Sequence, residues 1–85
     1  MSVRILYFAS LREALGCSEE VLECLPTGVA TAGALREWLS ARGGEWAALN
    51  AGRAVRVAVN QALVQLPHRL AEGDEIAFFP PVTGG

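Results

Sequence analysis

The residues best suited to chemistry in this 85-residue sequence stand at its end, in the segment FFPPVTGG. Because glycine lacks a Cβ, Gly84 and Gly85 can enter a channel too narrow for other residues, where the terminal carboxylate is the reactive group. A carboxylate is a poor acyl donor, but adenylation by a partner enzyme makes it electrophilic, and a sulfur nucleophile then converts it to a thiocarboxylate. A terminal glycine pair of this kind could therefore carry sulfur. A glycine pair alone also fits an inert, frayed end.

The residues before the glycines predict a stiff base for this tip. Pro80 and Pro81 have no amide proton, so they end the preceding strand at Phe79 and favour polyproline II. Residues 80–85 could then reach roughly 20 Å from the domain at about 3.3 Å per residue. We expect a folded domain over residues 1–79 and an extended functional tail over residues 80–85.

The other polar residues predict no second reactive centre. His68 is the only histidine, and its Pro-His-Arg turn offers no acid or nucleophile as a partner. The acids at positions 72–75 surround a glycine turn, are expected to be solvated, and lack the spacing of a calcium loop. Cys17 and Cys24 match neither a metal knuckle nor a CxxC redox pair. We therefore assign no metal site.

Composition limits both the size and the partners of the protein. The length is that of one domain, and a formal charge of −2, from nine acids and seven basic residues, argues against nucleic acid or an anionic membrane as a partner. All seven basic residues are arginines. The first ten residues have no basic leader and no span long enough to cross a bilayer, so we expect a cytoplasmic protein.

Apolar patterning predicts an α+β fold with the element order ββαβββ. The main helix follows Thr31 as N-cap and ends at Gly43-Gly44, and its apolar stripe includes Trp38, expected in the core. A short helix capped by Ser10 ends at Gly16. Strands are predicted over residues 3–9, 19–24, 55–59, 63–66 and 75–79, with a further turn at 45–49. The result is a mixed sheet of four to five strands with one main helix across one face.

The period of two along each strand assigns side chains to the two faces of this sheet. The helix should cover Val55, Val57 and Val59, together with Ile5, Tyr7, Ile76 and Phe78. The uncovered face then carries Leu6, Phe8, Ala58, Ala77 and Phe79. Exposed aromatic residues usually mark a contact surface. The alternative is that Phe8 and Phe79 pack against the 45–49 segment or the tail.

Three segments carry a resemblance to a known family. VNQ at 59–61, GDEIAFFPPVTGG at 73–85 and RILYFASLRE at 4–13 resemble the small subunits of molybdopterin synthase, which are ubiquitin-like sulfur carriers. The resemblance implies a β-grasp fold and Gly85 as the site of thiocarboxylation, after activation by an E1-like adenylyltransferase. It implies no permanently bound cofactor, only a transient acyl-adenylate and the thiocarboxylate. The implied partner-binding residues are Phe8, Leu63, Phe79, Pro80, Pro81, Val82 and Thr83.

The same resemblance implies the partners and the reaction. The tail would enter the large catalytic subunit of a heterotetramer of two small and two large subunits, and a sulfur donor protein would reload it. Two sulfur deliveries would convert cyclic pyranopterin monophosphate into the dithiolene of molybdopterin. The chain would donate sulfur without being a catalyst on its own.

Three alternatives remain at this point. The first is a sulfur carrier for thiamin synthesis or tRNA thiolation, against which the FFPP block argues. The second is a protein modifier joined through Gly85 to a target lysine. The third is a binding module with an inert tail.

Overall fold

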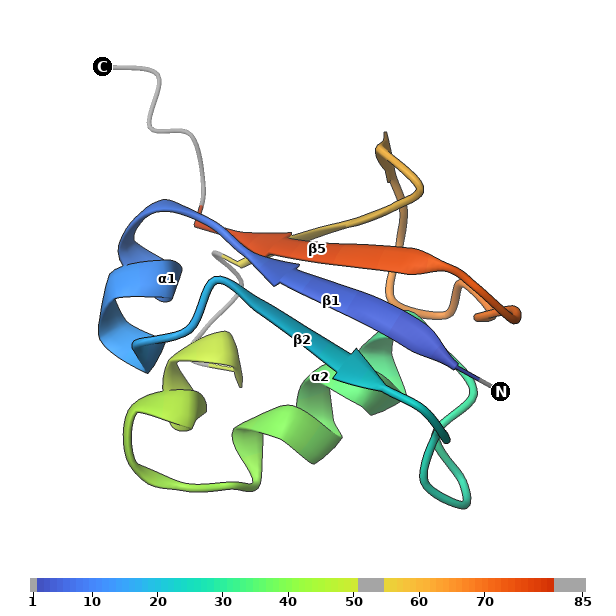
Figure 1. Ribbon diagram of the computed structural model, residues 1–85, viewed down its shortest axis with the longest axis horizontal. Helices are drawn as coiled ribbons and strands as arrows, with labels where there is room; N and C mark the ends of the chain where they lie inside the picture. The colour runs from blue at the N-terminus through green and yellow to red at the C-terminus, as the bar shows by residue number, and fades with distance from the viewer. Residues whose placement is uncertain (1, 51–54, 81–85) are drawn as a thin grey trace.

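The protein folds as a five-stranded mixed sheet with helices packed against one face (Figure 1). The computed structural model describes residues 2–50 and 55–80. Its elements are β1 (Val3–Tyr7), α1 (Ala9–Leu15), β2 (Glu19–Leu22), α2 (Ala32–Ser40), the 3-10 helix η1 (Gly44–Asn50), β3 (Arg56–Val59), β4 (Ala62–Leu63) and β5 (Glu75–Phe79). The predicted α+β class and the element order are confirmed. The main helix begins after Thr31 as predicted, but it ends at Ser40, before the predicted Gly43-Gly44, and Gly44 already belongs to η1.

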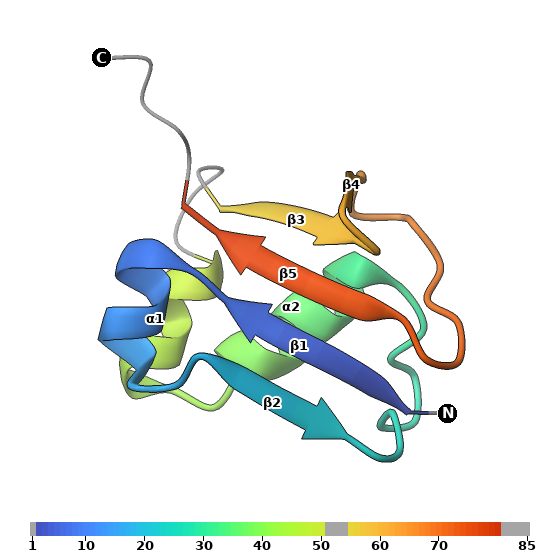
Figure 2. The same cartoon turned by 45° about the horizontal axis from the view of Figure 1, so that its top comes forward.

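The first and last strands lie side by side at the centre of the sheet, whose order is β2-β1-β5-β3-β4 (Figure 2). β1 and β5 run parallel, with Ile5 opposite Ile76 and Tyr7 opposite Phe78. The other neighbouring strands pair antiparallel. The parallel pairing brings the end of β5 next to Phe8, where the N–H of Phe8 donates to the carbonyl of Phe78 at 3.1 Å.

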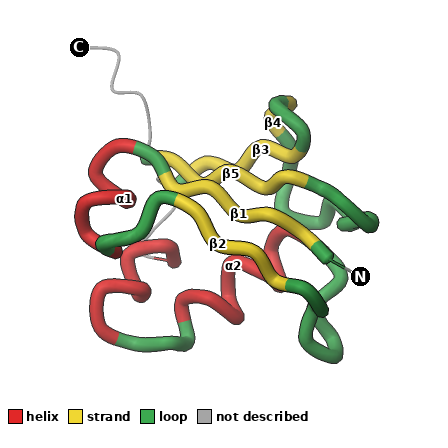
Figure 3. Tube along the Cα trace, viewed as in Figure 1, coloured by secondary structure: helices red, strands yellow, loops and turns green. Residues whose placement is uncertain are grey.

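Helix α2 begins at the predicted cap and crosses under the sheet. The side-chain oxygen of Thr31 accepts a hydrogen bond from the N–H of Ala34 at 3.1 Å, which satisfies one of the free donors of the first turn. Leu35 and Leu39, one turn apart, are fully buried against the strands. Figure 3 shows the helical segments gathered below and at one end of the strands. Over residues 2–50 and 55–80, no helix covers the opposite face, which we call the open face.

The core confirms most of the predicted inward residues. Eight large side chains are fully buried: Val3, Ile5, Tyr7, Leu35, Leu39, Leu49, Ile76 and Phe78. Val57 and Val59 are also buried. Val55 is half-buried, because β3 begins one residue after it. Trp38 is 36% exposed rather than in the core, since it flanks the buried stripe of α2.

Several predicted element ends were wrong. Ser10 does not cap the first helix, because α1 begins at Ala9 with Phe8 at the N-cap position and no side-chain hydrogen bond there. β1 therefore stops at Tyr7, and β2 stops at Leu22. The return strand covers residues 62–63 rather than 63–66, because the chain then turns toward α2, where the carbonyl of Leu66 accepts from the N–H of Gly33 at 2.8 Å. The helix end at Gly16, in the left-handed region with φ 67°, is confirmed.

Residues of the VNQ and GDE segments form a hydrogen-bonded clamp between the β3–β4 turn and the start of β5. Asp74 is buried, and its carboxylate accepts from the side-chain amide of Asn60 at 2.9 Å and from the N–H of Ala71 at 2.8 Å. The amide oxygen of Asn60 accepts in turn from the N–H of Glu75 at 3.0 Å. The expectation that all these acids are solvated is therefore wrong for Asp74, whose role is to hold the start of β5 against the β3–β4 turn.

Candidate functional site

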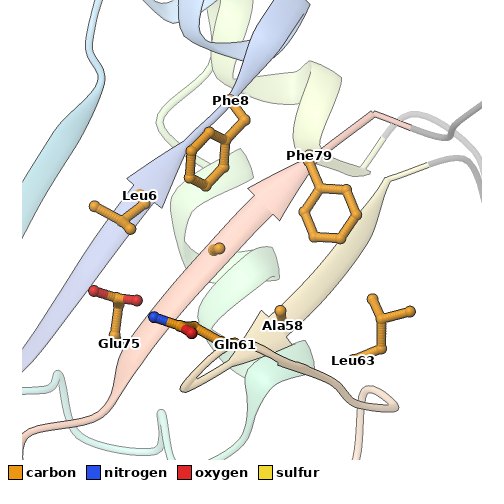
Figure 4. A pocket seen from close by; sticks show the side chains of 8 residues that line it. Leu6, Phe8, Ala58, Gln61, Leu63, Glu75 and Phe79 are labelled. Atoms are coloured by element: carbon orange, nitrogen blue, oxygen red, sulfur yellow. The ribbon is translucent and has the colours of Figure 1, made fainter.

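An apolar hollow of about 540 Å³ lies on the open face of the sheet (Figure 4). All five residues that the strand alternation assigned to this face line it, and three further residues complete the wall. The lining residues are Leu6, Phe8, Ala58, Gln61, Leu63, Glu75, Ala77 and Phe79. The size of the hollow suits an apolar side chain or two from a partner protein.

Small residues at the centre of the sheet create the depth of the hollow. Ala58 on β3 pairs directly with Ala77 on β5, so the middle of the open face carries only methyl groups. Larger side chains stand around this floor: Phe8 from the turn before α1, Leu63 from β4 and Phe79 from the end of β5 (Figure 4). The hollow therefore follows from the alternation of each strand together with the register between strands.

The rim residues remain accessible. Phe8 is 44% exposed and Leu63 is 62% exposed. The 45–49 segment does not cover Phe8: its Trp46 packs edge-on against Tyr7, with ring centroids 5.5 Å apart, on the helix side of the sheet. Burial of Phe8 beneath that segment, one of the two alternatives for the aromatic residues, is therefore wrong. The other part of that alternative, packing of Phe8 and Phe79 against the tail, falls on residues outside those that the structure describes.

One end of the hollow is bounded by an ion-pair cluster. The guanidinium of Arg4 lies 2.6 Å from the carboxylate of Glu75 and 3.4 Å from that of Glu19. Glu75 lines the hollow and is already paired, so it presents little free charge to an apolar ligand. The lining as a whole is apolar, with Gln61 and Glu75 as its polar members.

The C-terminal tail begins at the edge of this hollow. β5 ends at Phe79, as predicted, and Pro80 follows it directly in a half-buried position. The other predicted tail residues, namely Pro81, Val82, Thr83, Gly84 and Gly85, lie outside the described residues. Of the predicted site, the structure thus brings together Phe8, Leu63 and Phe79 around the hollow, with Pro80 directly after Phe79.

A polar network on the helix side was not predicted. The guanidinium of Arg42 donates to both oxygens of Glu20, at 3.0 and 2.6 Å, and lies over the rings of Trp38 and Trp46. The hydroxyl of Tyr7 also donates to Glu20, at 3.2 Å. Hydrogen bonds from Arg42 lower the pKa of Glu20, and burial raises the pKa of Tyr7. This network joins β1 and β2 to α2 and η1, so its role is structural.

The described residues offer no other candidate site of the kinds considered above. Within residues 2–50 and 55–80, no group of three His, Cys, Asp or Glu side chains is placed to hold a metal ion. None of the helices in the described ranges is long and apolar enough to span a membrane. Cys17 and Cys24 are free thiols, and Cys17 donates to the carbonyl of Glu19 at 3.2 Å.

A mixed five-stranded sheet over one main helix, with an apolar hollow at the end of β5, defines a ubiquitin-like β-grasp domain. The ThiS family matches residues 5–85, and the chain belongs to that family.

Similar proteins cover nearly the whole chain. It is 46% identical over 85 residues to the molybdopterin synthase sulfur carrier subunit of Escherichia coli (strain K12), covering 98% of this chain and 99% of that protein. It is 48% identical over 84 residues to the subunit of the same name from Haemophilus influenzae, with the same coverage. Among solved structures, SAMP1 from Haloferax volcanii, a small archaeal modifier protein, superposes with a TM-score of 0.74 at 30% identity over the full length of both chains.

Proposed function

We propose that this protein is the sulfur carrier subunit of a molybdopterin synthase, acting with a large catalytic subunit. One observation carries the proposal: Phe8, Leu63 and Phe79 surround the apolar hollow, and the tail leaves from its edge. A partner seated on the hollow would sit directly beside the root of the tail. The near-complete coverage of two relatives with this role supports it. The chain donates sulfur and is not an enzyme on its own.

The chemistry takes place at the carboxylate of Gly85. An E1-like adenylyltransferase joins this carboxylate to the AMP of ATP with release of pyrophosphate. A sulfide equivalent from a sulfur donor protein then displaces AMP, forming the C–S bond of the thiocarboxylate. In the synthase, the thiocarboxylate sulfur passes to cyclic pyranopterin monophosphate, and hydrolysis returns the carboxylate. Two deliveries from a heterotetramer of two small and two large subunits complete the dithiolene in the cytoplasm.

Docking draws its free energy from the rim of the hollow. Each aromatic ring can bury on the order of 150–250 Å² when a partner covers it, and a few such anchors usually supply most of the binding energy of an interface. The floor of alanines gives the partner's apolar side chain room to enter. The paired state of Glu75 avoids burying a lone charge in the same place.

The decisive experiment is a reconstituted sulfur transfer. The protein is prepared with a C-terminal thiocarboxylate and mixed with the large subunit and cyclic pyranopterin monophosphate, and the dithiolene product is assayed. We expect product only with the thiocarboxylate form, and none from the carboxylate form or from a variant lacking Gly85. That variant should keep its melting temperature, because the buried core is formed by residues that precede the tail. No product from the thiocarboxylate form, with a large subunit proven active with its own carrier, would overturn the proposal.

A second candidate function is protein modification through Gly85. The likeness to SAMP1 over the full chain favours it, and the absence of lysine would prevent the protein from forming chains on itself. In that case, ATP and an E1-like enzyme would attach the protein to lysines of other proteins in an extract, giving higher-mass bands that contain this chain. If the transfer assay fails and such bands form, the modifier function replaces the first proposal. The thiamin and tRNA alternatives would then be tested as well.

A further inference from the structure

The strands of the open face carry opposite charges at the two ends of the hollow. At one end, Arg4 pairs with both Glu19 and Glu75, which leaves this cluster with a net negative charge. At the other end stands Arg56, the first residue of β3. Its side chain points to the open face, because Val57, the next residue along the strand, is buried under the helices.

Arg56 lies next to the proposed anchor of the interface. In the antiparallel register of β3 and β5, Arg56 is directly opposite Phe79, so the two side chains are neighbours on the same face. Arg56 is exposed, and the ion pairs found within residues 2–50 and 55–80 use Arg4 and Arg42 but not Arg56. Among the described residues, Arg56 thus has no acidic partner, and it stands beside the last residue of β5.

Docking over Phe79 would remove water from this guanidinium as well. Burying a cation without a counter-charge is costly, so a partner that covers Phe79 tightly must supply an acceptor for Arg56. The planar fork of arginine matches a carboxylate with two parallel hydrogen bonds. We propose that Arg56 is a specificity-determining residue of this carrier, which pairs with an Asp or Glu carboxylate of the large subunit beside the pocket for Phe79. The inference rests on the proposed function.

The charge asymmetry also orients the two subunits. A partner with a carboxylate at the tail end meets Arg56 there, and in the reversed orientation that carboxylate meets the net negative cluster around Arg4. Like charges placed together at an interface disfavour the wrong arrangement, and complementary charges speed the encounter. Arg56 therefore selects the docking that brings the tail to the catalytic subunit, and discriminates against large subunits without the matching acid.

Binding kinetics of the purified carrier with the large subunit from the same organism test this proposal. We expect Arg56→Glu to lower the affinity at least about 30-fold at low salt, Arg56→Gln to lower it about tenfold, and Arg56→Lys to retain most of it. The losses should shrink at high salt, because the Debye length falls from about 10 Å at 0.1 M to about 3 Å at 1 M. Melting curves of each variant establish that it is folded.

A charge-matched control is Arg69→Glu. Arg69 is exposed and its backbone bridges Thr31 at the start of α2, away from the strands of the open face. The Arg69→Glu substitution changes the net charge by the same amount as Arg56→Glu and should leave the affinity for the large subunit unchanged. If Arg56→Glu and Arg69→Glu lower the affinity by the same factor, the effect comes from net charge alone and the proposal is overturned.

Leu63→Ala separates this inference from the proposed function. If Leu63→Ala weakens binding and Arg56→Glu and Arg56→Gln do not, the hollow docks the partner but the carboxylate pairing is refuted. If none of these variants weakens binding, both the pairing and the proposed docking surface are refuted. A charge swap tests the pair directly. The Arg56→Glu carrier is combined with a large subunit in which one acidic residue is changed to lysine, and restored affinity would establish that this acid pairs with Arg56.

Discussion

Removal of the Asp74 carboxylate should cost this small domain a large part of its stability. Asp74→Ala deletes two hydrogen bonds, from the Asn60 amide and from the N–H of Ala71, and leaves both donors without their partner. Hydrogen bonds to a charged group contribute about 1.5–3 kcal/mol each, and Asp74 is 9% exposed, so water replaces them only in part. We expect a loss of about 3 kcal/mol in the free energy of unfolding.

Such a loss is easily measured in a domain of this size. Urea unfolding followed by far-ultraviolet circular dichroism should show a lower midpoint with an unchanged slope, since the amount of surface exposed on unfolding stays the same. With about 4–8 °C of melting temperature per kcal/mol, the thermal midpoint should fall by roughly 12–24 °C. Asp74→Asn should lose about half as much, because it keeps one acceptor oxygen and turns an N–H toward a donor.

The adjacent acid provides the control. Glu75→Gln removes a carboxylate one position along the chain that pairs with Arg4, whose side chain is 51% exposed. A half-exposed ion pair contributes at most about 1 kcal/mol, so this variant should melt close to the wild type. An Asp74→Ala variant that unfolds no more easily than Glu75→Gln would refute the assignment of the VNQ and GDE segments as a structural clamp.

Three further predictions follow from the geometry. Because hydrogen bonds from Arg42 lower the pKa of Glu20 in the folded state, its stabilisation is present above the unfolded value of 4.5 and is lost as the pH falls. The stability difference between the wild type and Glu20→Gln should therefore shrink as the pH falls below about 4.5 in urea titrations, and a constant difference would contradict this. Gly33→Ala, which usually stabilises a helix by about 1 kcal/mol, should destabilise here by roughly that amount in thermal melts. The reason is that the added Cβ at position 33 would lie 3.0 Å from the Cβ of Leu66 and 3.1 Å from the carbonyl oxygen of Leu66. Leu63→Ala, at a position 62% exposed, should lower the affinity for the large subunit at least about tenfold with little change in melting temperature. Val21→Ala, at a position 55% exposed on the same face but outside the hollow, should leave that affinity intact in the same assay.

Local features of the chain could be predicted from the sequence because short-range physics controls them. The cap at Thr31, the helix end at Gly16 and the bounds of β5 each depend on the conformational preferences of a few consecutive residues. Strand alternation likewise assigned Phe8 and Phe79 to the open face before any pairing was known. The resemblance of the tail added the chemistry that the alternation could not supply.

The pairing of distant segments required the folded structure. Nothing in the local pattern indicates that β1 runs parallel to β5, or that Ala58 meets Ala77 to form the floor of the hollow. The pair of Glu20 and Arg42, 22 residues apart, gives no periodic signal either.

The exposure of residues at the margins of the core also depends on the folded structure. Trp38 shares the helical spacing of Leu35 and Leu39, yet it is 36% exposed and the guanidinium of Arg42 lies over its ring, 5.0 Å from the centroid. Alternation tells which side of a strand a residue faces. Which residues lie across from it, and whether anything covers them, depends on how the whole chain packs, since contacts between distant segments form only when the chain closes on itself.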